Sequence, residues 1–334
     1  MNEETNNGLI LNNQYYLPAE ILSLILTKVD VTTLSKHCTL VCKQWNGIIK
    51  ENVWKLKCEQ ELMENDENKQ KLRQLLRQKQ YSYIVYQTIF IRNQSFYTNL
   101  IKNWDNLKFW KICRYSISVF SLEDINDNIC KITDEMKLNN ITKCWTPAIH
   151  LPMRKIQIID LCKRTGLTQQ FIDEYQPPIY VSDWYGNRRT EHVTSIYKLC
   201  VVLYDTDYNE IERCNCNFLF ESIVEQGQGG FFRKAQHVFK NYGKNVRYVY
   251  FWHSAIDRIR EWREDQSCCT KYAGANVQLF YPNDTRLDHV IDGNSQQKIH
   301  KNCRKEYCEV ECISQIPEYF TNKKYLFCIH TGPD

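Results

Sequence analysis

The chain has 334 residues, enough for one large domain or for two or three smaller ones. Hydrophobic residues make up 43% and charged residues 25%, which is ordinary for a soluble globular protein. The 43 Lys and Arg residues nearly balance the 39 Asp and Glu residues. The resulting net charge of +4 is too small to indicate the concentrated basic footprint of a nucleic-acid-binding protein, so nucleic acid is not an expected partner.

The N-terminal segment "MNEETNN" is acidic and polar where a secretion signal would be basic. The apolar segment 17–29 is too short and too interrupted by polar residues to cross a bilayer. We therefore expect a protein of the cytoplasm, with the nucleus as the alternative, and no membrane insertion. In either compartment the 16 cysteines are expected to be reduced thiols that pack as small apolar groups.

Residues 1–14 are polar and are predicted to be disordered, and residues 15–58 are predicted to form three short helices. In the first, "LPAEILSLILTKVD" (17–30), the apolar side chains span an arc of roughly 200°, about twice an ordinary core-facing stripe. Asp30 can cap the second helix, and "LVCKQWNGII" predicts the third, carrying Leu40, Val41, Trp45 and Ile48. So short a segment cannot bury all these apolar groups by itself, which indicates a partner protein.

The segment after it, residues 59–80, is rich in Glu, Lys, Gln and Leu and contains no Gly or Pro, which predicts a helical spacer. From about residue 96 the sequence turns to β-branched and aromatic runs separated by Gly-containing turns. The runs are 178–185, 196–204, 246–253 and 276–282. They predict an antiparallel sandwich with one helix near 160–175 set into it.

The N-terminal pattern resembles an F-box, through Leu17-Pro18, Glu20-Ile21, Ile25-Leu26, Val29-Asp30, Leu34, Leu40-Val41-Cys42, Trp45 and Trp54-Lys55-Leu56. The resemblance implies docking on a Skp-type adaptor, which connects to a cullin–RING ubiquitin ligase. The alternative is a small helical bundle that packs on the protein's own sandwich. The residues implied to bind the adaptor are Leu17, Pro18, Ile21, Leu22, Ile25, Leu26, Leu40, Val41, Cys42 and Trp45.

A second resemblance, to the F-box-associated domain of the sugar-recognising F-box family, follows in "TNLIKNWDN", "RKIQIIDL", "VSDWYGNRRTE", "SIYKLCVVL" and "HVFKNYGKNVRYVYFWHSAID". It implies a jelly-roll-like, galactose-binding-like β-sandwich. The predicted fold class is thus multidomain α+β. Its parts are an F-box over 15–58, a helical linker over 59–95, a β-sandwich over 96–282 and a Cys-containing tail of unknown fold over 283–334.

Some members of that family bind the inner chitobiose of N-glycans on misfolded glycoproteins, and others bind no glycan. The family's pocket positions correspond here to His150, Glu191 and the run Glu261-Trp262-Arg263. Only Trp262 keeps the family's aromatic surface, because His150 stands where a Phe is found and Glu261 where a Tyr is found. Two readings stay open: a glycan site built on Trp262, Glu191 and Arg263, or a protein-binding loop over the charged residues 258–266.

Other residues of the sandwich are predicted to be structural. Trp184 is expected to pack inward, and His237, His253 and Tyr242 are expected to be hydrogen-bonded core or turn residues. The tail holds His and Cys residues at C-x₄-C and C-x₃-C spacings, which are a weak signal for zinc, so no metal or cofactor is predicted.

No motif for nucleophilic or metal-assisted catalysis is present. The expected function is therefore that of a non-catalytic substrate receptor of a Skp–cullin–F-box ubiquitin ligase. The client is a glycoprotein or a protein recognised without its glycan. A non-degradative scaffold with the same adaptor is the alternative.

Overall fold

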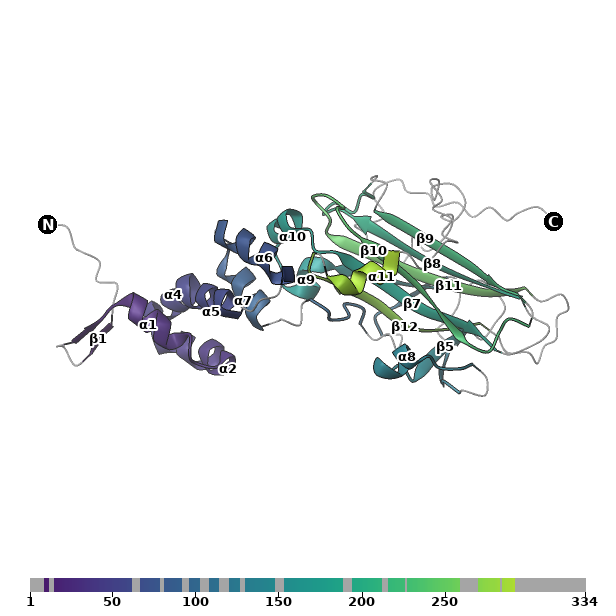
Figure 1. Cartoon of the computed structure of the whole chain (residues 1–334), viewed down its shortest axis with the longest axis horizontal. Coiled ribbons are helices and arrows are strands. Elements are labelled where there is room, and N and C mark those ends of the chain that lie inside the picture. Colours follow the sequence, from purple (N-terminus) through teal and green to yellow (C-terminus); the bar gives the residue numbers. More distant parts are fainter. Residues whose placement is uncertain are drawn as a thin grey trace.

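The computed structural model has helices at one end and an antiparallel β-sandwich at the other (Figure 1), which confirms the predicted fold class. The residues that the structure describes are 9–11, 15–61, 67–78, 81–91, 96–102, 108–113, 120–126, 130–147, 153–188, 194–211, 216–225, 227–258, 270–282 and 284–291.

The N-terminus contains a short hairpin, in which β1 (Leu9–Leu11) pairs antiparallel with β2 (Tyr15–Leu17). The predicted disorder of residues 1–14 is therefore wrong at residues 9–11. Both strands are apolar or aromatic triplets, residue types that favour paired, extended backbone.

Three helical segments follow. The first is α1 (Ala19–Leu26). The second runs through α2 (Val31–Thr33), a π-helical turn (Leu34–Cys38) and α3 (Thr39–Val41). The third runs through α4 (Lys43–Ile48), a π-helical turn (Ile49–Val53) and α5 (Trp54–Glu61).

The predicted helix starts are right at one place and shifted at another. The Asp30 carboxylate accepts a hydrogen bond from the Thr33 backbone N–H at 2.9 Å, which confirms Asp30 as a helix cap. The predicted third helix is wrong at its start, because Cys42 is extended and its sulfur accepts from the Trp45 N–H. Leu40 and Val41 therefore end the second helical segment and do not lie on the third.

The spacer is helical, as predicted, but it divides into α6 (Glu67–Gln78) and α7 (Tyr83–Ile91). Between these two helices, Tyr81 attaches the spacer to the sandwich. The Tyr81 hydroxyl donates to the Glu174 carboxylate, and its ring packs edge-on against Phe171 at 5.8 Å between centroids. The Thr88 hydroxyl adds a bond to the Gly166 carbonyl at 3.3 Å. One continuous hydrophobic core runs from α1 through these helices into the sandwich.

The sandwich consists of two five-stranded antiparallel sheets. Sheet B has the order β10 (Phe232–Phe239), β7 (Ile179–Asn187), β12 (Thr270–Leu279), β5 (Lys143–Pro147), β4 (Phe120–Asp124). Sheet C has the order β3 (Lys111–Cys113), β6 (Met153–Asp160), β11 (Tyr248–Arg258), β8 (Thr194–Tyr204), β9 (Asn217–Val224). The inner faces meet through aromatic pairs, such as Tyr185 stacked on Tyr197 at 4.5 Å.

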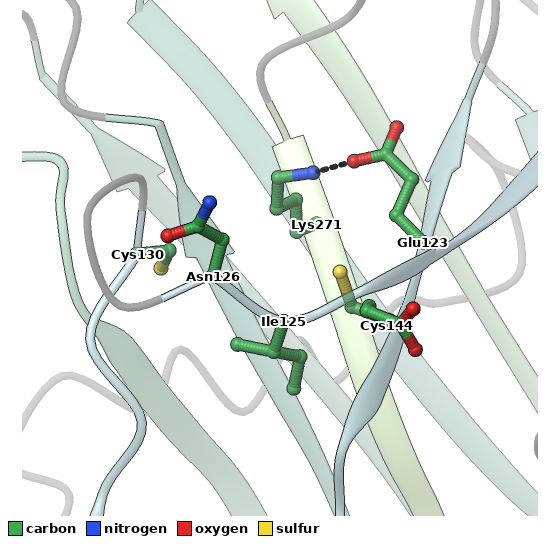
Figure 2. Close-up of a pocket in the computed structure, with 7 residues that line it drawn as sticks. Glu123, Ile125, Asn126, Cys130, Cys144 and Lys271 are labelled. Carbon is green, nitrogen blue, oxygen red and sulfur yellow. Dashed lines mark hydrogen bonds and ion pairs between the residues drawn. The ribbon is translucent and has the colours of Figure 1, made fainter.

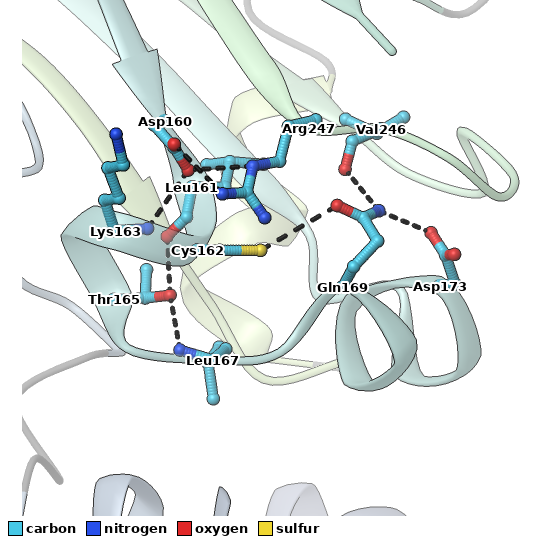
Figure 3. A network of polar contacts seen from close by, with 10 residues as sticks. All are labelled: Asp160, Leu161, Cys162, Lys163, Thr165, Leu167, Gln169, Asp173, Val246 and Arg247. Carbon is cyan, nitrogen blue, oxygen red and sulfur yellow. Dashed lines mark hydrogen bonds and ion pairs between the residues drawn. The ribbon is translucent and has the colours of Figure 1, made fainter. Parts of the chain in front are cut away.

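The helix predicted near 160–175 is two helices, α9 (Leu161–Thr165) and α10 (Gln169–Tyr175). Gly166 separates them with a left-handed φ of 76°, a conformation that glycine adopts without steric cost. Figure 3 shows how this corner is fixed: Arg247 pairs with Asp160 at 3.0 Å, and the Gln169 amide donates to Asp173 and to the Val246 carbonyl. The linker thus meets a rigid corner of the sandwich.

Trp184 is buried, but on the opposite side from the one predicted. Its neighbour Asp183 points between the sheets, so Trp184 lies on the outer face of sheet B, because side chains alternate along a strand. There it packs with Met136 of α8 (Asp134–Leu138) and with Ile141. The prediction that Trp184 packs between the sheets is therefore wrong. Its side chain is covered instead by α8 and by Ile141.

The structural roles predicted for two other residues are confirmed. The buried Tyr242 hydroxyl donates to the Pro177 carbonyl at 3.0 Å. His253 is fully buried and its Nδ1 bonds to Asp183. His237 stacks on Phe218 at 4.5 Å, and burial lowers its pKa to about 4, so its ring is neutral at pH 7.

Candidate functional site

The first helix shows how its wide apolar arc is used. Leu22 and Leu26 face inward and are almost fully buried in the chain's own core. Ile21, Leu24 and Ile25 lie on the other side of α1, each about half exposed. A helix that is apolar on both sides needs cover on both, and the described part of the chain buries only one of them.

The end of the second helical segment adds to the exposed group. Leu40 is 80% exposed and Val41 is 60% exposed. We call Ile21, Leu24, Ile25, Leu40 and Val41 the N-terminal apolar surface. Large apolar side chains that stay exposed on successive helical segments indicate an interaction site more strongly than a single exposed leucine does.

The structure distributes the other predicted adaptor-binding residues between surface and core. Cys42 is exposed, while Leu17, Pro18 and Trp45 are half-buried. Leu22 and Leu26 belong to the supporting core. The predicted set does not contain Leu24, which is half exposed on α1. Leu24 lies in the apolar arc of "LPAEILSLILTKVD", and that arc was the signal that could have added it to the set.

Beneath this surface, a buried lysine ties the helices together. The Lys57 ammonium donates to the carbonyls of Thr27 and Val29, both at 2.7 Å, at the C-terminal end of α1. Burial lowers the pKa of Lys57, while the nearby Asp30 acts in the opposite direction. Positive charge at a helix C-terminus is favourable, so this contact fixes α1 against α5.

The predicted client-binding residues His150, Glu191, Glu261, Trp262 and Arg263 lie outside the described residues. The strands that flank them are described, and their pairing is informative. Thr270 pairs with Asn187, Arg258 pairs with Thr194, and Met153 pairs with Ala255. The three connecting segments therefore all leave the sandwich at one end.

That end is opposite the corner that carries the linker. β6 begins at Met153 and ends at Asp160, just before α9, and β7 begins after α10 and ends at Asn187. The N-terminal helices and the strand ends that flank these segments thus lie at opposite ends of the molecule (Figure 1).

A small cavity near this far end is closed by charge pairing. Figure 2 shows Lys271 pointing at Glu123, with Cys130 and Cys144 beside them. The cavity volume is about 10 Å³, room for roughly one water molecule. Burial raises the pKa of Cys130 to about 12 and that of Cys144 to about 11, so neither thiol is a nucleophile at neutral pH.

Comparison with known proteins decides the family. The family model described as the F-box associated region matches residues 91–277, more than half of the chain, and the F-box-like model matches residues 15–60. The chain belongs to the F-box-associated family. The predicted resemblances to an F-box and to this domain are thereby confirmed.

Relatives extend over both parts of this F-box protein. F-box only protein 44 of Homo sapiens is 26% identical over 255 residues, covering 75% of this chain and 91% of that protein. F-box only protein 2 of Bos taurus is 25% identical over 247 residues, covering 73% of this chain and 77% of that protein. A solved structure of TmCBM61 with β-1,4-galactotriose aligns at a TM-score of 0.31 and 10% identity, over 55% of this chain and 99% of that chain.

Two searches of the described residues gave no candidate. No described helix is long and apolar enough to span a bilayer. No group of three or more His, Cys, Asp or Glu side chains in the described ranges could hold a metal ion. The Cys and His residues of the tail, from His300 to His330, lie outside these ranges.

Proposed function

We propose that this F-box protein is the substrate-receptor subunit of a Skp–cullin–F-box ubiquitin ligase. The observation that carries the proposal is the N-terminal apolar surface within a chain whose remaining part is an F-box-associated sandwich. The F-box helices recruit the adaptor, the linker helices hold the sandwich at a fixed distance, and the sandwich presents the client. The ubiquitin chemistry belongs to other subunits, and the receptor acts in the cytoplasm or nucleus.

The adaptor role is tested by placing charge on the N-terminal apolar surface. Ile25→Asp combined with Leu40→Asp is expected to reduce co-purification of a Skp-type adaptor at least tenfold, because two carboxylates would be buried without partners. Both side chains are about half exposed or more, so the fold itself should tolerate the change. The measurement is quantitative pull-down with co-expressed adaptor.

Leu138→Asp is the matched control, because Leu138 is 83% exposed, like Leu40, but lies on α8 beside the sandwich. This variant should bind the adaptor as wild type does. Undiminished adaptor binding by the double variant would contradict the proposed role of the F-box. If the adaptor binds but client turnover is unchanged when the protein is removed, the scaffold alternative gains support.

We further propose that the client contacts the far end of the sandwich, through the segments that carry His150, Glu191 and the run Glu261-Trp262-Arg263. The strand pairing supports this proposal, since it brings the three segments to one end, away from the F-box. A client held there would lie at the end of the protein farthest from the adaptor-binding helices.

A glycan array, probed with the adaptor-bound protein, separates the two kinds of client. Binding of chitobiose-containing N-glycans that is lost in Trp262→Ala would support a glycoprotein client, because the indole is the one aromatic surface retained for stacking on sugar. A blank array with a folded complex would favour a protein client recognised by the charged segment 258–266.

A further inference from the structure

The outer face of sheet C carries an apolar stretch where a solvent-facing sheet would be polar, beside a polar row that contains Arg154, Lys198 and Glu221. Antiparallel strands with one wet face alternate apolar and polar residues, but β8 reads "TSIYKLCVVLY" and β11 reads "YVYFWHSAIDR". Tyr197, Leu199 and Val201 of β8 point into the core, so Cys200 and Val202 point outward. Sequence of this kind is typical of a strand that is covered on both faces.

The strand pairing aligns these outward side chains in rows. Trp252 pairs with Ile156 on one side and with Cys200 on the other, and Cys200 pairs with Leu219. The next row contains Tyr250 and Val202. We call these residues the outer aromatic face: Ile156, Trp252, Cys200, Leu219, Tyr250 and Val202.

The outer face of sheet B is covered by other segments of the same chain. Met136 of α8 and Ile141, which follows α8, pack on Trp184. Leu287, just before α11 (Asp288–Ile291), and Val290, within α11, pack with Tyr180 and Phe280. The cluster on sheet C differs, because its described members all come from the strands of the sheet itself. An apolar face that spans four strands is expected to have a dedicated cover.

The position of α11 indicates which segment that is. Val290 of α11 packs in one cluster with Val238 of β10, the edge strand of sheet B. β10 faces β9, the edge strand of sheet C, as the stacking of His237 on Phe218 shows. The chain therefore leaves α11 on the outer face of sheet B beside β10, and it reaches the outer aromatic face by passing the two edge strands on that side, β10 and β9.

The remaining 43 residues, 292–334, have the length and the chemistry to cover it. Extended chain spans about 3.3 Å per residue, so a short part of this segment bridges the roughly 10 Å that separate the two sheets. The segment has equal numbers of acidic and basic residues, and its apolar residues gather in "CISQIPEYF" and "YLFCI". The segments between strands of the sandwich that lie outside the described residues are each much shorter than this tail, and strands hold both of their ends.

We propose that residues 292–334 fold back over the outer aromatic face and pack on β9, β8 and β11. The tail is then the missing layer of the F-box-associated domain in this protein, and its apolar residues are held by Trp252, Tyr250 and Leu219. The proposal is independent of the adaptor and of the kind of client.

Photo-crosslinking within the full chain tests the proposal. Tyr250→p-benzoylphenylalanine places the crosslinker on the outer aromatic face, and Leu138→p-benzoylphenylalanine on α8 is the control. Irradiation followed by peptide mass spectrometry is expected to join position 250 to peptides of 292–334, and position 138 to none of them. Mixing ¹⁴N- and ¹⁵N-labelled chains distinguishes a crosslink within one chain from a crosslink to a second copy. Leu219→p-benzoylphenylalanine replaces the first reporter if that variant does not fold.

Crosslinks from position 250 to a second copy, to the adaptor or to another segment of the chain would overturn the proposal, and so would the absence of tail crosslinks in folded protein. A second measurement uses thiol alkylation of the full chain with Leu326→Asp and Phe327→Asp in the tail. Cys200 should then react at least tenfold faster than in the wild-type chain, while Cys144, which is buried with Met136 of α8, should not change. Unchanged protection of Cys200, or an equal rise at both thiols, would contradict the proposal.

Discussion

Replacing Asp183 with Asn is expected to lower the free energy of unfolding by about 3–5 kcal/mol. Asp183 is fully buried between the two sheets and accepts hydrogen bonds from the Tyr197 hydroxyl at 2.5 Å and from His253 Nδ1. Its other carboxylate oxygen accepts from the Trp184 backbone N–H. The substitution keeps the shape but removes the one negative charge that this cluster contains in the described residues.

Lys155 makes the loss of that charge costly. Its ammonium is fully buried, has no hydrogen-bond acceptor among the described residues, and lies over the rings of Trp145 at 4.1 Å and Trp110 at 4.6 Å. Burial lowers the pKa of Lys155 well below its ordinary value, and the charge of Asp183 opposes that change. Without Asp183, only the aromatic faces remain to stabilise a charged Lys155.

A double-mutant cycle separates the charge effect from packing. Lys155→Met alone should leave stability within about 1 kcal/mol of wild type, since an apolar side chain of similar length replaces a buried ammonium. The double variant should lose at least about 1 kcal/mol less than the sum of the single losses. Urea denaturation measures all four proteins, and a loss below about 1 kcal/mol for Asp183→Asn would contradict the assignment.

Trp54→Ala is expected to destabilise the helical end by about 3–5 kcal/mol, through lost burial and the cavity left behind. Trp54 is 1% exposed at the start of α5 and packs against Phe90 of α7 at 6.3 Å between ring centroids. It therefore joins the F-box to the linker. Adaptor binding should fall as well, although Trp54 is not on the surface, because α1 rests on the same core.

Trp54→Phe serves as the control, since a smaller aromatic ring keeps most of the apolar contact, and it should cost less than half as much as Trp54→Ala. Hydrogen exchange in α1 and α7 is the second measurement. If Trp54→Ala left exchange in α7 unchanged, the F-box and the linker would not share one core.

The F-box could be predicted from local pattern because its signals are local. The wide apolar arc of α1 and the cap at Asp30 need only neighbouring residues, and both were correct. The break at Cys42 was not, since a cysteine that caps a helix through its sulfur leaves no distinctive pattern. The division of the arc into buried Leu22 and exposed Leu24 depends on which helix packs beneath, so only the structure could decide it.

In the sandwich, the strand runs and turns were visible in the sequence, but the direction of side chains was not. Trp184 and Tyr185 are adjacent large aromatic residues in β7, and this strand is buried along its whole length, so residue type shows no alternation from which to assign a face. The placement of Trp184 under α8 depends on a segment that lies 46 to 50 residues earlier in the chain, so local pattern could not reveal it.

Residue types at short spacing were enough to predict the family, the order of the domains and the presence of more apolar surface than the F-box can bury. The tertiary structure was needed to learn which apolar groups stay exposed, how Asp183, His253 and Lys155 meet, and which strand ends lie opposite the F-box. The physical reason is that burial, ion pairing and relative position depend on strand register and on contacts between residues far apart in the chain.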